Sequence, residues 1–235
     1  MKRVAIVQSN YVPWKGYFDL IAAVDEFILL DNVQFTTGSW RNRNRVKTAT
    51  GVRWLSIPIV RGPLNRPINE VVAGDPDWRL KHWRVLTDAY RKAPYWADTA
   101  PVLERLYESC ESLRLSAINR HFLEGVCDIL GIRAGFTRAE DYHPTGSRTE
   151  RVVDLCRKAG ADEYVTGPAA RAYLDESLFH DAGIGVHWFD YSGYPEYPQI
   201  HPPFDHQVSV LDLIVNTGPA AARYLKSAAP SSTRS

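Results

Sequence analysis

The sequence has no charge bias, no disulfide pattern and no long hydrophobic run. Its 28 Lys and Arg residues balance 27 Asp and Glu residues, so overall charge does not attract the protein to nucleic acid or to an anionic membrane. The three cysteines are odd in number and show no CxxC spacing, which argues against a disulfide framework and a zinc site. The N-terminal stretch MKRVAIVQSNYVPW contains only a short apolar run, which does not fit a signal peptide. We therefore expect a cytoplasmic protein with no membrane partner.

Sequence motifs for metal sites, phosphate loops and catalytic triads are missing as well. The seven histidines show no HxH or HExxH spacing, so we expect no metal site. No stretch matches the P-loop or the dinucleotide-binding fingerprint. Cys127 and Cys156 fall on apolar helical stripes and are expected in the core. Any function must therefore arise from local clusters of polar side chains.

The first 31 residues have the pattern of a β-α-β unit. Residues 3–7 and 26–31 are nearly continuous apolar runs, as in strands covered on both faces, and residues 16–25 repeat apolar side chains at helical spacing. The connection is too long for a hairpin, so the two strands should be parallel, with both carboxyl ends at one edge of the sheet. The sequence predicts an α/β fold with a Rossmann-like parallel sheet.

The rest of the chain extends this pattern into one α/β domain, residues 1–226, with an inserted helical region at about 75–130. Helices are expected at residues 77–92, 101–113 and 116–130, and residues 52–60 indicate an edge strand or hairpin arm. A capping-box spacing from Ser147 to Glu150 begins another helix, which ends at Gly160. The Ser-, Ala- and Pro-rich tail, residues 227–235, is expected to be disordered.

Two polar clusters follow the two N-terminal strands, at the sheet edge where parallel α/β sheets bind ligands. The first, QSNYVPWKGY, lies at a strand-to-helix junction, which favours an anionic group; the second is DNVQFTTGSWRNRNR. For a single residue, packing of the loop is an equal alternative, but the density of the clusters favours a ligand. The candidate substrate-binding residues are Gln8, Asn10, Tyr11, Trp14, Lys15, Tyr17, Asn32, Gln34, Trp40, Arg41, Asn42 and Arg43.

The stretch SWRNRNRVKT, residues 39–48, alternates arginine with asparagine. A solvated charged edge is the usual explanation of such a run. Planar guanidinium groups, however, suit phosphate or carboxylate recognition, which favours a functional role. In a strand, alternation would place Arg41, Arg43 and Arg45 on one face, and we expect this set, beside Trp14, to contact the ligand instead of the asparagines.

Weaker candidates lie further along the chain. Ser147 and Thr149 in TGSRTER, and Thr166 and Gly167 in YVTGPAAR, precede predicted helices and could bind an anionic group, although a helix cap explains the first pair equally well. The acid or base candidates are Asp31, which ends a buried strand beside the cleft, and Asp19 and His82.

The order of several motifs resembles the WbqC-like protein family across about residues 3–218. The motifs are QSNYVPWKGYFDLI, LLDNVQF, SWRNRNRVKT, KAPYW, TERVVDLCRKAGADEYVTGPAARAYL and VSVLDLIVNTG. The resemblance implies a role in bacterial O-antigen or natural-product biosynthesis, with transfer of an acyl or aminoacyl group to an amine, often of an amino sugar. At the strand ends we expect a small anionic or nucleotide-linked substrate. We expect no required cofactor, a nucleotide or acyl thioester as co-substrate, and a carrier protein or aminoacyl donor as partner.

A more distant similarity concerns the loop after the first strand. VPWKGYFDLI has the layout of the HxGH loop of pantothenate-synthetase-type nucleotidyltransferases, with Trp14 and Tyr17 at the two histidine positions. Neither aromatic side chain donates a proton as imidazole does, so adenylyl transfer by that route is not expected. Because the layout of the loop is nevertheless similar, a nucleotidyltransferase-like enzyme is one alternative to the transferase. A non-catalytic nucleotide or nucleic-acid binder is the other, and the near-neutral charge argues against a nucleic-acid partner.

Overall fold

The protein is built around a five-stranded parallel sheet with the strand order β5-β2-β1-β6-β7. The computed structural model describes residues 1–63 and 65–227. The strands are β1 (Arg3–Val7), β2 (Glu26–Leu29), β5 (Gly135–Arg138), β6 (Glu163–Thr166) and β7 (Gly185–Trp188). The predicted α/β fold with a Rossmann-like parallel sheet is thus confirmed. The chain changes direction across the sheet between β1 and β6, which is where ligands bind in sheets of this kind.

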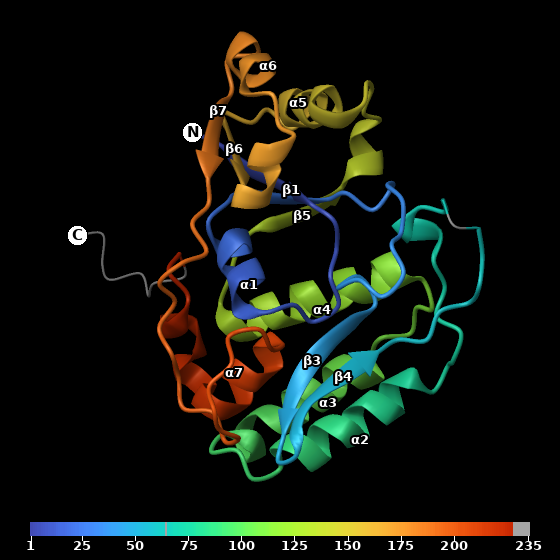
Figure 1. Ribbon diagram of the computed structural model, residues 1–235, viewed down its shortest axis with the longest axis vertical. Coiled ribbons are helices and arrows are strands. Elements are labelled where there is room, and N and C mark those ends of the chain that lie inside the picture. The colour runs from blue at the N-terminus through green and yellow to red at the C-terminus, as the bar shows by residue number, and fades with distance from the viewer. Residues whose placement is uncertain (64, 228–235) are drawn as a thin grey trace.

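Helices cover both faces of the sheet (Figure 1). On one face lie α5 (Arg148–Lys158) and α6 (Glu176–Asp181), and on the other lie α1 (Lys15–Ala22) and α4 (Leu115–Leu130). Alternate residues of β1 enter different clusters: Val4 and Ile6 pack with α5 and α6, whereas Ala5 packs with α1 and α4. Burial on both faces explains why the strands are continuous apolar runs in the sequence.

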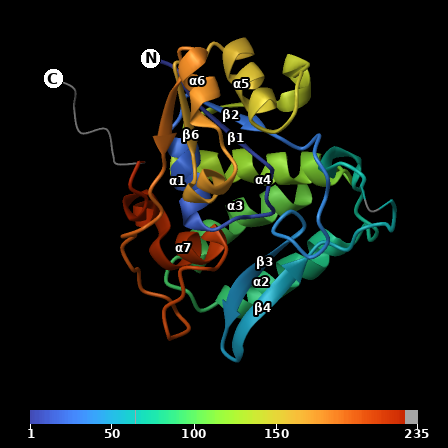
Figure 2. The same cartoon turned by 45° about the horizontal axis from the view of Figure 1, so that its top comes forward.

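A second layer lies beyond α4 (Figure 2). It contains the antiparallel hairpin of β3 (Arg43–Thr48) and β4 (Gly51–Ser56), with α2 (Trp78–Tyr90), α3 (Trp96–Glu108) and α7 (Val210–Thr217). Tyr107 of α3 and Phe122 of α4 touch at a ring distance of 4.7 Å, so this layer shares one hydrophobic core with the sheet. Of the helical region at 75–130, α4 packs under the sheet itself and leads into β5.

Short 3-10 turns connect the larger elements: η1 (Ile68–Glu70), η2 (Ala139–Tyr142), η3 (Pro168–Ala172) and η4 (Gly218–Tyr224). The Ser147 and Glu150 capping box begins α5 as the sequence predicted. None of the helices in the described ranges has the length and apolar character needed to span a bilayer. Residues 228–235, most of the tail expected to be disordered, lie outside the described residues.

One strand assignment differs from the expectation and matters for the site. A turn with Gly38 at φ +69° precedes the hairpin, and β3 begins only at Arg43. Arg41 therefore lies before the strand, and its side chain does not share the face of Arg43 and Arg45 by strand alternation. The three arginines have separate partners, as described below.

Candidate functional site

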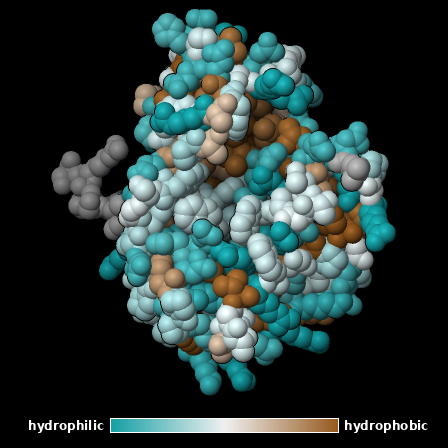
Figure 3. Space-filling view, in the orientation of Figure 1, coloured by the Kyte–Doolittle hydropathy of each residue, from teal (hydrophilic) through white to brown (hydrophobic). Residues whose placement is uncertain are grey.

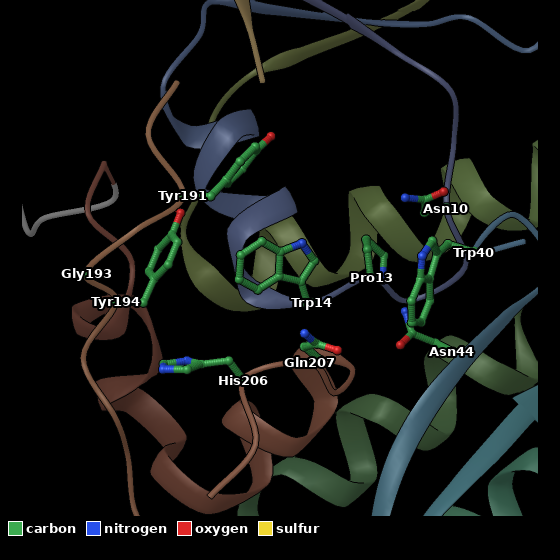
Figure 4. Close-up of a pocket in the computed structure, with 10 residues that line it drawn as sticks. All are labelled: Asn10, Pro13, Trp14, Trp40, Asn44, Tyr191, Gly193, Tyr194, His206 and Gln207. Carbon is green, nitrogen blue, oxygen red and sulfur yellow. The ribbon is translucent and has the colours of Figure 1, made fainter. Parts of the chain in front are cut away.

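A cavity of about 580 Å³ opens where the segments after β1 and β7 meet the hairpin (Figure 4). We call it the aromatic cavity. In the space-filling view, hydrophobic residues are visible in a hollow below the α5 and α6 layer (Figure 3). The aromatic cavity is distinct from these residues, since none of its lining residues is strongly hydrophobic. The cavity is lined by Asn10, Pro13, Trp14, Trp40, Asn44, Tyr191, Gly193, Tyr194, His206 and Gln207. Aromatic walls with a few amides and one imidazole are typical of a small-molecule site.

Asn10 presents a fixed hydrogen-bond donor to the aromatic cavity. The guanidinium of Arg41 donates to Asn10 Oδ1 and to Gln8 Oε1. Since the Asn10 oxygen is occupied, its amide nitrogen is left to face the ligand, and in Figure 4 that nitrogen points toward the centre of the cavity. Arg41 therefore orients Asn10, and the segments after β1 and β2 lie in contact here.

The loop after β1 is held in a strained conformation. Val12 has φ +34°, which is an outlier for a β-branched residue. Asn44 Nδ2 donates to the carbonyl oxygens of Tyr11 and Val12 at 3.1 and 3.0 Å, and Ser209 Oγ donates to the Val12 carbonyl at 2.7 Å. These bonds fix the cavity wall before any ligand binds, as is common where strain serves a site.

Lys15 ties the loop after β7 to the start of α1. Its side chain is 3% exposed, and Nζ donates to the Pro195 carbonyl at 2.6 Å. Burial lowers the Lys15 pKa to about 8. The ammonium group lies 5.1–6.0 Å from the ring centroids of Tyr194, Tyr197, Phe204 and Tyr224. This aromatic cage positions the segment that carries Tyr194 and His206 into the cavity wall.

His206 is the one imidazole in the cavity lining given above. Burial lowers its pKa, and the nearby charge of Lys15 lowers it further. Its Nδ1 is buried without a hydrogen-bond partner among the described residues. The lowered pKa favours the neutral form of the imidazole, and its Nδ1 is enclosed in the cavity wall.

The three acid or base candidates from the sequence lie outside the cavity lining. His82 bonds Tyr11 Oη at 2.9 Å, and burial lowers its pKa to about 4. Asp19 accepts from Tyr194 Oη at 2.6 Å and from the Ser227 backbone. Asp31 accepts from the Ser9 backbone and from Ser116, and burial raises its pKa. All three are buried and hydrogen-bonded within the protein, so their contacts indicate a structural role.

The other sequence candidates are distributed around this centre. Tyr17 is buried and donates from Oη to the Gln8 carbonyl at 2.9 Å. Asn42 donates to the Ile57 carbonyl at 2.9 Å inside the hairpin, and Gln34 forms a bridge with Pro67 away from the cavity lining. Asn32 Oδ1 is buried without a partner among the residues described.

Arg43 and Arg45, which lie on β3, make contacts that stabilise the hairpin and the loop beside it. Arg43 stacks on Trp54 at 4.2 Å, and Arg45 donates to the Gln207 carbonyl and lies 3.7 Å from Asp205. The expectation that Arg41 and Arg43 converge with Trp14 is therefore wrong in geometry, because the turn before β3 separates them. Asn44, from the set not favoured, lines the cavity.

The glycine and hydroxyl candidates divide into two groups. Ser147 caps α5, and Thr149 Oγ1 accepts from the Asp175 backbone at 3.2 Å, so both have structural partners. Thr166 ends β6, and Gly167 follows it against Tyr191, where an added Cβ would come within 2.9 Å of the Tyr191 ring. Gly167 thus allows Tyr191 to approach the sheet edge and line the cavity.

The WbqC-like protein family matches residues 8–224. The chain belongs to this family. Within the curated proteins, "Uncharacterized protein Rv1507c" from Mycobacterium tuberculosis is 46% identical over 227 residues, which is 96% of this chain and 98% of that protein. No solved structure matches the chain. The family assignment therefore covers every segment that lines the aromatic cavity.

Sequence reasoning did not assign Pro13, Asn44, Tyr191, Gly193, Tyr194, His206 or Gln207 to the site. The last five lie in DYSGYPEYPQIHPPFDHQ, an aromatic and proline loop without helical or strand periodicity. Its one signal was composition: a loop with three tyrosines beside prolines seldom remains unpacked, because aromatic side chains bury large areas.

Proposed function

We propose that the protein transfers an acyl or aminoacyl group to the amine of a small acceptor, for example an amino sugar, in bacterial surface-polysaccharide or natural-product biosynthesis. The observation that carries the proposal is that a neutral imidazole, His206, and a fixed amide donor, Asn10, line the same aromatic cavity from opposite sides. Flat rings pack against the apolar face of a sugar or acyl chain, and the amides bind its polar groups.

His206 would act as the general base. When the acceptor amine attacks the acyl carbonyl, its nitrogen becomes cationic and strongly acidic, so an imidazole of lowered pKa suffices to remove the proton. The same imidazolium then returns the proton to the leaving group. Since Nδ1 is buried in the wall, Nε2 is the ring nitrogen that would take the proton.

Asn10 would stabilise the transition state. In the tetrahedral intermediate the carbonyl oxygen carries a negative charge, which a preorganised N–H donor stabilises more than the neutral ground state. Arg41 holds the Asn10 amide with its nitrogen toward the cavity. The C–N bond then forms as the C–S bond of a thioester, or the C–O bond of an aminoacyl ester, breaks, and the thiolate or alkoxide takes the proton from His206.

The test is release of free thiol from acyl thioesters in the presence of amino sugars, with the N-acylated product identified by mass spectrometry. His206→Asn should reduce turnover by about 10²–10⁴-fold, the usual contribution of a positioned base. The matched control is His187→Asn, since His187 is exposed on β7 outside the lining and should retain activity.

Pyrophosphate release from a nucleoside triphosphate, without amine acylation, would support the nucleotidyltransferase-like alternative in place of this proposal. Ligand binding that weakens with salt but produces no product would support a binding protein. The structure offers little for a nucleic-acid binder, because Arg45 bonds the loop at Gln207 and Arg43 stacks on Trp54, so the arginine run does not form an extended basic face.

A further inference from the structure

Arg41 is a half-buried cation that lacks an anionic partner in the described part of the chain. Its guanidinium donates to the neutral side-chain oxygens of Gln8 and Asn10 and forms no ion pair there. These two bonds use only part of its five N–H donors. Burial lowers the Arg41 pKa, which reflects the cost of a charge without full compensation. An anion delivered by a ligand would gain from this uncompensated charge.

Asp31 attracts Arg41 but is not its counter-ion. The Asp31 carboxylate accepts from the Ser9 backbone at 2.8 Å and from the Ser116 hydroxyl, and no ion pair with Arg41 is formed. Burial also raises the Asp31 pKa, so its negative charge is itself disfavoured. The carboxylate therefore fixes Ser9 and the start of α4, and the anion position beside Arg41 stays available.

Trp40, the residue before Arg41, provides a flat surface in the wall of the aromatic cavity. Arg41 lies behind that wall and is bonded to its residue Asn10. The Trp40 side chain is 43% exposed, so indole surface is accessible to a ligand. Trp54 supports the indole at a ring distance of 5.4 Å, and Arg43 lies over Trp54 at 4.2 Å. This row of Arg43, Trp54 and Trp40 holds the Trp40 indole at the cavity as a rigid platform for a planar ring.

We propose that the aromatic cavity has a nucleotide subsite, in which a planar base stacks on Trp40 and a phosphate accepts from the Arg41 N–H groups that Gln8 and Asn10 leave free. The inference rests on the proposed function in assigning this nucleotide to the group donor, because the donor must share the cavity with the acceptor. The position also fits the fold, since the loop after β1 lies at the switch point between β1 and β6. A planar guanidinium suits two phosphate oxygens at once.

The test is calorimetric titration with adenosine 5′-diphosphate and uridine 5′-diphosphate, and with adenosine, uridine and acetate as reference ligands. The diphosphates should bind about tenfold to a hundredfold more tightly than the nucleosides, as expected from a charge-assisted contact. Equal affinity of nucleoside and diphosphate, or no binding of either diphosphate at millimolar concentration, would overturn the subsite. Binding of acetate as tight as that of the diphosphates would assign Arg41 to a carboxylate and overturn the phosphate.

Variants separate the platform from the anion position. Arg41→Gln should remove the preference for diphosphate over nucleoside, whereas Trp40→Ala should weaken both ligands together by at least about tenfold. Arg41→Lys should recover only part of the affinity, because a point charge does not reproduce the bidentate fork. Trp83→Ala is the control: Trp83 stacks on Trp96 at 5.4 Å outside the cavity and should leave binding unchanged. Unchanged binding in Arg41→Gln, with melting temperature as a folding check, would contradict the inference.

These measurements use no acyl donor, so they fail or succeed separately from the transferase assay. If thiol release with an amino sugar occurs but no diphosphate binds, the transferase proposal stands and the nucleotide subsite is wrong. If diphosphates bind through Arg41 and Trp40 but no acyl transfer is detected with any thioester, the subsite stands and the proposed chemistry is wrong.

Discussion

Replacing Asn10 by aspartate should raise stability and lower ligand affinity together. The substitution is nearly isosteric and supplies the carboxylate that Arg41 lacks. An ion pair would form where a neutral amide now accepts the guanidinium N–H. The same charge would repel an incoming phosphate and would remove the amide donor that faces the cavity.

The size of the stability gain follows from the burial of the pair. Exposed ion pairs contribute about 0.2–1 kcal/mol, and because Arg41 and Asn10 are half-buried we expect the upper end, about 1 kcal/mol. For a domain of this length, 1 kcal/mol corresponds to roughly 2–4 °C in melting temperature. Because Arg41 lowers the pKa of the new carboxyl group below its unfolded value of about 4, the gain is present above pH 4 and is lost as the pH falls below it.

Asn44→Asp is the matched control, since it makes the same chemical change in the same cavity. The Asn44 amide donates to the carbonyl oxygens of Tyr11 and Val12 and is 3% exposed. Aspartate there loses both donors and places a charge against two carbonyl oxygens. We expect a loss of about 3–5 kcal/mol, or a fall of at least about 6 °C in melting temperature.

Thermal unfolding followed by circular dichroism at pH 7 and pH 3.5, with calorimetric titration of a diphosphate, measures both effects. Opposite signs for Asn10→Asp and Asn44→Asp, with binding lost in the former, would agree with the electrostatics above. A destabilised Asn10→Asp protein that binds diphosphate as well as the wild type would refute the view of Arg41 as an uncompensated cation.

Three further outcomes are expected. Gly16→Ala should weaken ligand binding more than stability, because its Cβ would lie 2.3 Å from the Trp14 ring and would displace that ring at the cavity; titration and melting temperature compare the two. Because burial lowers the His82 pKa from 6.5 to about 4, its neutral form should stabilise the fold fully above pH 6.5. That contribution, about 3 kcal/mol, should be lost as the pH falls toward 4, and urea unfolding should show that His82→Gln lacks it. The purified protein should contain no stoichiometric zinc, and elemental analysis showing one zinc per chain would contradict this.

The sheet could be predicted from the sequence because its signal is local. Residues 3–7 and 26–31 are apolar runs of strand length, and the helix between them repeats at a period that a single window shows. The capping box at Ser147 and Glu150 is equally local. The arginine run was harder, since alternation assumes a strand, and the turn before Arg43 removed that assumption for Arg41.

Most of the cavity lining could not be predicted because long-range packing determines it. Nothing near His206 in the chain indicates that Lys15, far away in sequence, lowers its pKa and holds its loop. Asp31 and His82 were assigned as acid or base from residue type, but their hydrogen bonds to Ser9 and Tyr11 depend on segments that no local pattern brings together. Residue type suggests a chemical ability, whereas the three-dimensional contacts decide whether it is free to act.

The strained turn at Val12 and the caged Lys15 together explain how one cavity wall can combine such distant segments. Ser209, the N-cap of α7, donates to the Val12 carbonyl, so α7 helps to hold the loop after β1 in its outlier conformation. Lys15, the first residue of α1 after this loop, holds the segment that leads into α7 through Tyr197 and Phe204. Each segment thus stabilises the other, and a ligand meets a preorganised wall. Such preorganisation lowers the entropic cost of binding and suits a site that must align two substrates for group transfer.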